Sequence, residues 1–114
     1  MKDRDVALLE KIIQHAEEVE GTILRFSLNL DKFKSDYVAK NAITMCILQI
    51  GELANNITDE MKLKYDKMPW RDIVGLRNRV AHTYSTVDKE ILWHIATSNI
   101  PELKSYCEKI INQG

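Results

Sequence analysis

The chain has 114 residues, the size of one domain, and its 45% hydrophobic and 29% charged residues exclude a disordered protein. No apolar run approaches the ~20 residues that span a membrane, and the charged N-terminal stretch is not a signal segment. The formal net charge of -1 gives no global indication of nucleic-acid binding, so any such contact requires a local patch. We expect a single cytoplasmic domain over residues 1–114.

The first predicted helix covers about Asp5 to Glu20. Its apolar residues recur at helical spacing and form one face: Val6, Leu9, Ile12, Ile13, Ala16 and Val19. Gly21 weakens the pattern without necessarily ending it, so the helix could continue to Phe26. His15 lies at the edge of the apolar face, where we expect it to be exposed to solvent.

The second predicted helix runs from about Ser35, a candidate N-cap, to Ile57. Its main apolar stripe contains Ala39, Ile43, Cys46, Ile47, Ile50, Leu53, Ala54 and Ile57. Met45 and Leu48 fall off this stripe. A second apolar face indicates either a central position in a bundle or a partner chain, whereas scattered exposed residues are the simpler alternative.

The rest of the chain continues the helical pattern. A polar link, Thr58–Met68, precedes a third helix predicted over about Pro69–His82, with the proline at its first position. A fourth helix begins near Asp88, which can cap it, and Asn99 and Pro101 mark a break before a last helix. No alternation typical of strands is present, so the sequence predicts an all-α fold of four or five antiparallel helices.

The sequence gives no local signature of a metal site. Cys46 and Cys107 each lie in a helical apolar pattern, and neither has a nearby Cys or His at metal-ligand spacing. We expect both to be reduced core residues. No two histidines together with carboxylates show the local spacing of a zinc site, and His94 is expected at the surface or at an interface. We therefore predict no metal and no cofactor.

The third predicted helix departs from its own apolar pattern at Arg77. At about 100° of rotation per residue, Arg77 projects into the middle of a side formed by Trp70, Ile73, Val74, Val80 and Ala81. A guanidinium is costly to bury and stays protonated, so it must meet a carboxylate, a partner chain or a ligand phosphate. Glu52, opposite the main stripe of its helix, is either plain solvent surface or the counter-charge of Arg77.

Two further polar residues lie close to Arg77 in the sequence. Asn78 and His82 are four residues apart and share one face, and Gly75 on the same side allows another backbone or a ligand to approach. His82 lies about 140° around the helix from Arg77. One straight helix therefore does not bring their tips together, but two copies across a twofold axis would gather four such groups.

Arg77, Asn78 and His82 suit metal-free RNA cleavage. Histidine transfers protons near neutral pH, and arginine supplies fixed charge and forked donors that match phosphate oxygens. The amide would orient the imidazole or donate to the phosphate. The alternative is a helix end, with His82 stabilised by the helix dipole and Arg77 extended into solvent, and spacing alone favours that alternative.

The longer sequence segment around Arg77, Asn78 and His82 favours the catalytic interpretation. The segment WRDIVGLRNRVAHTY resembles the R-x4-H-x-Y signature of HepT-type HEPN proteins, in which Arg77, His82 and Tyr84 stand at the named positions. Asn78 fills the polar position after the arginine. The upstream string IGELA and the downstream string VDKEILW are similar to two further segments of the family, although Leu53 departs from its usual alanine. The resemblance covers nearly the whole chain in order and spacing.

The resemblance implies a HEPN bundle that forms a homodimer, with both motifs facing a shared cleft. It also implies a metal-independent ribonuclease that acts as the toxin of a toxin–antitoxin system, with RNA as substrate and Arg77, Asn78 and His82 as catalytic residues. The usual antitoxin is a minimal nucleotidyltransferase, MntA, which would transfer AMP to Tyr84. That modification would add negative charge and bulk where the RNA phosphate must lie.

Two other classes of function stay open. A non-catalytic nucleotide-binding or adaptor HEPN subunit of a nucleotidyltransferase complex would keep the fold without cleaving RNA. A purely structural helical dimer would need no ligand at all. Tyr84 could likewise pack its ring and hydrogen-bond a neighbour instead of accepting AMP.

Overall fold

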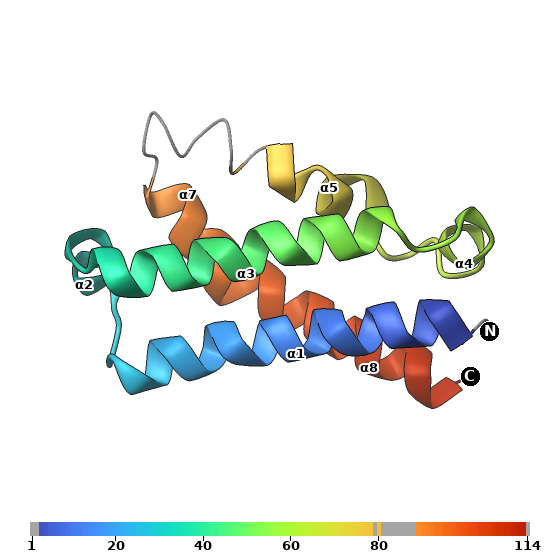
Figure 1. Cartoon of the computed structure of the whole chain (residues 1–114), viewed down its shortest axis with the longest axis horizontal. Helices are drawn as coiled ribbons and strands as arrows, with labels where there is room; N and C mark the ends of the chain where they lie inside the picture. Colours follow the sequence, from blue (N-terminus) through green and yellow to red (C-terminus); the bar gives the residue numbers. More distant parts are fainter. Residues whose placement is uncertain (1–2, 79, 81–88, 114) are drawn as a thin grey trace.

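The computed structural model describes residues 3–78, 80 and 89–113, and within these ranges every regular element is helical, which confirms the all-α prediction. Helices α1 (Asp3–Arg25) and α3 (Tyr37–Asn55) run antiparallel and side by side, and α8 (Ile100–Gln113) crosses behind them (Figure 1). The main apolar core lies between these helices. None of the described helices is long and apolar enough to cross a membrane.

Helix α1 buries the predicted face and continues past Gly21. Its fully buried residues include Leu9, Ile12, Ala16 and Val19. The helix ends in a Schellman-type turn, in which the N–H of Leu28 donates to the Ile23 carbonyl at 2.9 Å. Ser27 stands in the left-handed region of this turn, with φ 49°. The turn therefore redirects the chain toward the next helix without a glycine.

A short helix, α2 (Leu30–Ser35), precedes α3 and was not predicted. Ser35 ends α2, so its predicted role as the N-cap of the next helix is wrong. Asp36 caps α3 instead, because its Oδ1 accepts two backbone N–H groups at 3.0 and 3.1 Å. Phe33 is fully buried and anchors α2 to the core.

The predicted polar link Thr58–Met68 contains another short helix, α4 (Asp59–Lys64), which was not predicted from the sequence. Thr58 caps α4, because its hydroxyl oxygen accepts the N–H of Met61 at 3.3 Å. Asp5, only 2% exposed, accepts both the N–H and the hydroxyl of Thr58, at 3.0 and 2.7 Å. This buried carboxylate is hydrogen-bonded and fixes the start of α4 to α1.

Helix α5 (Trp70–Val74) is the first part of the helix predicted over about Pro69–His82. The described residues of that range are helical apart from Pro69 and Gly75, which confirms the prediction in large part. Pro69 precedes α5 as its N-cap residue and is not its first helical residue. A turn at Gly75 interrupts the helix before residues 76–78, which are helical again. The helix packs on α3, so the segment that carries Arg77 lies against α3.

Residues 89–113 form one continuous helix. Helix α7 (Lys89–His94) leads into a π-helical stretch, η1 (Ile95–Asn99), and then into α8 without a break. The predicted break at Asn99 and Pro101 is therefore wrong. In the π-helical stretch the N–H of Ile100 donates to the carbonyl of Ile95, five residues back. The next residue is Pro101, which has no N–H to donate. Asp88, the predicted cap of the fourth helix, lies outside the described residues.

The cysteines are free and buried, as predicted. Burial raises the pKa of the Cys46 thiol to about 11, with a further contribution from Glu18, and that of the Cys107 thiol to about 12. The two described histidines differ from each other. His94 is exposed, as predicted, whereas His15 exposes only 26% of its side chain, so the prediction that it is solvent-exposed is wrong.

Candidate active site

Arg77 lies just beyond the turn that follows α5 and pairs with a carboxylate of α3. Its Nη1 donates to Oε2 of Glu52 at 2.8 Å. The side chains expose 62% and 47% of their surface, so the pair lies at the surface of the bundle. Of the alternatives open for Glu52, the one in which it counters Arg77 is confirmed.

The predicted position of Arg77 in the middle of an apolar side is wrong. The buried residues of this segment are Trp70, Ile73, Leu76 and Val80, whereas Val74 is only partly buried. Leu76 takes the inward position that the predicted pattern left out, so Arg77 lies at the rim of the buried face. From the rim the long side chain reaches Glu52 without the desolvation cost of a buried guanidinium.

A close contact with α3 fixes the backbone at Arg77. A Cβ added to Gly51 would meet the backbone nitrogen of Arg77 at 3.0 Å and its Cβ at 3.4 Å. A side chain at residue 51 would force the Arg77 segment to move by a few tenths of an ångström, and glycine avoids this. Gly51 therefore allows the Arg77 segment to pack closely on α3, and Glu52, the next residue, pairs with the Arg77 side chain.

The glycine expected to allow the close approach of another backbone or a ligand was Gly75. Among the described residues the close backbone contact lies at Gly51 instead, and the approach of a ligand to Gly75 stays a prediction. A Cβ at Gly75 would meet the carbonyl oxygens of Arg71 and Asp72, which belong to its own turn. Sequence reasoning did not assign the close approach to Gly51. The signal was present in the IGELA string, where a glycine stands within a buried stripe of a long helix.

The remaining predicted site residues are placed only in part. Asn78 is described and exposed, next to Arg77. His82 and Tyr84 lie outside the described residues, so their roles stay predictions. The described part of the site thus presents a guanidinium fork and an amide at the surface. Both can donate hydrogen bonds to phosphate oxygens.

The Arg77–Glu52 pair leaves the cation available to a ligand. Exposed ion pairs contribute about 0–1 kcal/mol, because water screens both charges. The bond to Glu52 uses one terminal nitrogen of a planar group that carries five N–H donors. Glu52 can therefore hold the guanidinium in place while other donors of the fork face a phosphate.

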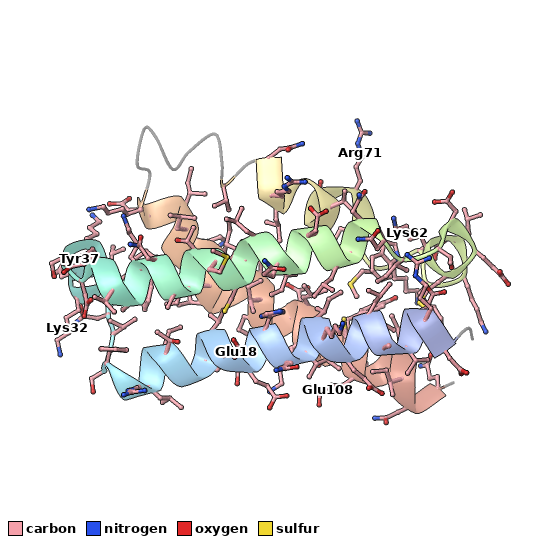
Figure 2. All side chains as sticks on the ribbon, viewed as in Figure 1. Glu18, Lys32, Tyr37, Lys62, Arg71 and Glu108 are labelled. Carbon is pink, nitrogen blue, oxygen red and sulfur yellow. The ribbon has the colours of Figure 1, made fainter. Side chains whose placement is uncertain are left out.

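An exposed apolar strip on α3 leads to this ion pair. Val38, Met45 and Glu52 are seven residues apart along α3, so they lie in one line on its surface. Val38 and Met45 expose 54% and 56% of their surface, and Tyr37, labelled at the start of α3 in Figure 2, exposes 72%. Leu48 packs partly against the core of its own chain. Of the two residues predicted to lie off the stripe, Met45 is thus the exposed one.

A cavity of about 410 Å³ lies between α5 and α8, lined in part by Met68, Ile73, Leu103 and Tyr106. Arg71 stands at its edge and points away from the bundle (Figure 2). Neither Arg77 nor Asn78 lines this cavity. Gly75 and Leu76, directly before Arg77, do line it, so the cavity adjoins the segment that carries the candidate active site.

Fold and site together define a small all-helical protein that presents an arginine fork and an amide side by side at its surface. The chain belongs to the HepT-like ribonuclease family, because the model of that family, described as Ribonuclease HepT-like, matches residues 9–110. This match spans every element that builds the site.

Individual relatives agree with the family match. The chain is 32% identical to "Putative RNase MJ1216" and 32% identical to "Putative RNase MJ0125", both of Methanocaldococcus jannaschii. These alignments cover 97% of this chain and 91% and 95% of the relatives. It is also 29% identical to "Probable ribonuclease HepT" of Thermococcus cleftensis, over 96% of this chain and 98% of that relative. No solved structure matches the chain.

Proposed function

We propose that this protein is a metal-independent endoribonuclease that acts as the toxin of a toxin–antitoxin system. The observation that carries the proposal is the exposed Arg77, held at 2.8 Å from Glu52 in a chain of the HepT-like ribonuclease family. An arginine fixed at the surface, with Asn78 beside it, suits the binding of an RNA phosphate.

Each catalytic residue has a separate task in this proposal. His82 transfers the protons: the 2′-hydroxyl of RNA loses one as its oxygen attacks phosphorus, and the departing 5′-oxygen gains one as its bond to phosphorus breaks. Arg77 stabilises the charge that develops on the phosphorane, and Asn78 orients the imidazole or donates to the phosphate. No metal ion is needed for these steps, because protein side chains supply both the proton transfer and the positive charge.

The active form in this proposal is a homodimer with a shared cleft. The exposed strip Tyr37, Val38 and Met45 supports it, because a second copy would cover apolar surface that otherwise meets water. The strip lies on one line of α3 with Glu52, so a twofold axis close to Glu52 would cover part of the strip and bring the two Arg77–Glu52 pairs together. Light scattering at micromolar concentration should show a dimer, and Met45→Glu should shift it to monomer. A wild-type protein that is only monomeric would contradict the shared cleft.

The partner in this proposal is a minimal nucleotidyltransferase of the MntA type, which inactivates the enzyme by transferring AMP to Tyr84. The added phosphodiester would repel an RNA phosphate two residues from His82. The support for this step is the family resemblance of the WRDIVGLRNRVAHTY segment.

Purified protein incubated with RNA in the presence of EDTA tests the proposed function. Wild type and the matched control His94→Ala, at an exposed histidine of α7, should cleave RNA, whereas His82→Ala should not. Far-UV circular dichroism should show the same helical spectrum for all three. Cleavage that stops in EDTA and returns with a divalent metal would overturn the metal-free mechanism. A folded dimer that never cleaves RNA would favour the non-catalytic adaptor.

A further inference from the structure

A cluster of three metal-ligating side chains lies where α1 packs on α3, away from the candidate active site. His15 and Glu18 come from α1, one helical turn apart, and Cys46 comes from the facing side of α3. The Nδ1 of His15 is 3.8 Å from Oε2 of Glu18, and that oxygen is 3.7 Å from Sγ of Cys46. One ligand atom from each residue lies within 4.8 Å of the others.

Among the described residues, part of the hydrogen-bonding capacity of this cluster is unused. Nδ1 of His15 is buried and has no hydrogen-bond partner among the residues that the structure describes. Burying a nitrogen without a hydrogen-bond partner costs folding free energy, which a bound ligand or ion would offset. The thiol of Cys46 donates to Oε2 of Glu18 at 3.7 Å, so the potential sulfur and oxygen ligands already lie side by side.

The arrangement fits a tetrahedral metal ion. Zinc binds nitrogen and oxygen at about 2.0–2.2 Å and sulfur at about 2.3 Å, which separates tetrahedral ligand atoms by roughly 3.3–3.8 Å. The observed separations reach this range through small rotations of the side chains. A thiolate, an imidazole and a carboxylate suit Zn²⁺ better than Mg²⁺ or Ca²⁺, which prefer oxygen alone.

The site is also accessible from solvent. Glu18 exposes 48% of its side chain, and Figure 2 shows it on α1 where that helix runs beside α3. An ion could enter past this carboxylate, and a water molecule could fill the fourth position. Cys46 and Glu52 lie six residues apart on α3 and about 120° apart around its axis, so the cluster faces α1 whereas Glu52 faces Arg77.

We propose that His15, Glu18 and Cys46 form a zinc site that ties α1 to α3 and stabilises the fold without taking part in RNA cleavage. On binding, a Zn–S bond forms and the Cys46 thiol releases its proton to solvent. Burial and the neighbouring Glu18 raise the pKa of the free thiol to about 11, so without a cation this cysteine stays protonated at neutral pH.

Titration of the metal-free full chain with Co²⁺ tests the site, because cobalt replaces zinc and absorbs light when a thiolate binds it. Wild type should show the thiolate-to-cobalt absorption at one equivalent. Cys46→Ser should abolish it, and His15→Gln should weaken Co²⁺ binding at least about tenfold. The matched controls are Cys107→Ser and His94→Gln, at residues outside the cluster, and both should bind like wild type.

A second measurement concerns stability and keeps the test independent of any one variant. Zn²⁺ in excess should raise the Tm of wild type by about 5 °C or more, since it binds only the folded chain. Glu18→Gln should reduce this rise, whereas Glu17→Gln, at the neighbouring exposed carboxylate, should not. RNA cleavage at a temperature below both Tm values should be the same with and without zinc.

Three results would overturn the proposal. The first is the absence of the cobalt–thiolate absorption in wild type. The second is an absorption that survives in folded Cys46→Ser or is lost equally in Cys107→Ser. The third is a specific Co²⁺ site whose occupation by Zn²⁺ leaves the Tm unchanged, which would remove the stabilising role.

Discussion

Gly51 of α3 and the backbone of Arg77 lie so close that a Cβ at residue 51 would be 3.0 Å from the Arg77 nitrogen. This contact joins α3, which with α1 forms the pair of longest helices, to the segment that carries the candidate catalytic residues. It places the guanidinium within reach of Glu52, the next residue along α3. The position of the proposed phosphate-binding group is therefore set by backbone packing as well as by its ion pair.

Gly51→Ala should weaken both the fold and the site. The new methyl group would push the Arg77 segment away from α3, and such overpacking costs about 1–3 kcal/mol. Gly21→Ala is the matched control, because its Cβ would meet nothing within 4 Å and alanine favours the helix by about 0.5–1 kcal/mol. Urea unfolding measures both changes, and equal stabilities of the two variants would contradict the close contact.

Arg77→Lys should leave the fold unchanged and lower kcat for RNA cleavage by roughly 10²-fold, because a point charge cannot replace the forked donors. Arg71→Lys is the control, since Arg71 is exposed and lies outside the candidate site. Steady-state cleavage assays distinguish the two variants. Full activity of Arg77→Lys would show that the fork is not required.

Glu52→Gln should separate the positioning role of this carboxylate from its contribution to stability. Because the pair is exposed, stability should change by less than about 1 kcal/mol. The guanidinium would lose its anchor, so kcat should fall roughly tenfold or more while KM changes little. Glu90→Gln removes another exposed ion pair, with Lys34, and should not affect cleavage. Equal effects of the two substitutions on kcat would refute a positioning role for Glu52.

Tyr84→Phe should keep much of the RNA cleavage, because the hydroxyl has no part in the proposed proton transfers. It should escape inactivation by an active nucleotidyltransferase partner. In wild type, co-expression with that partner should add one or more AMP masses to the peptide that contains Tyr84, as measured by mass spectrometry. AMP found on another residue, with the Phe variant still neutralised, would place the modification elsewhere.

Alkaline pH should destabilise the metal-free protein through Cys107. The pKa of this thiol rises from its ordinary value of 9.0 to about 12 in the folded chain. As pH rises above about 9, the unfolded chain loses the proton and the folded chain keeps it, so the stability present below pH 9 is lost toward pH 12. Urea unfolding at pH 8 and 10.5 should therefore show a smaller loss for Cys107→Ala than for wild type. Cys46→Ala should reduce the loss by a similar amount, because pH 10.5 also lies below the folded-state pKa of about 11 of the Cys46 thiol.

Local patterns in the sequence predict the helical class and the inward faces of the long helices. Apolar residues at helical spacing, such as Leu9 and Ile12, predict burial wherever a helix packs on a core, and both are fully buried. The string around Arg77 also indicated the family that the match to residues 9–110 shows. These features are local, so they can be read from neighbours along the chain.

Tertiary structure alone decided the features that depend on contacts between distant residues. Periodicity placed Arg77 in an apolar side, but the turn at Gly75 and the burial of Leu76 moved it to the rim, where Glu52 reaches it. The short helix α4 depends on its cap Thr58, which Asp5 of α1, 53 residues away in the sequence, holds through two hydrogen bonds. Cys46 meets Glu18 across 28 residues, a pairing that no local spacing reveals, because helix packing and not sequence distance sets which side chains share a site.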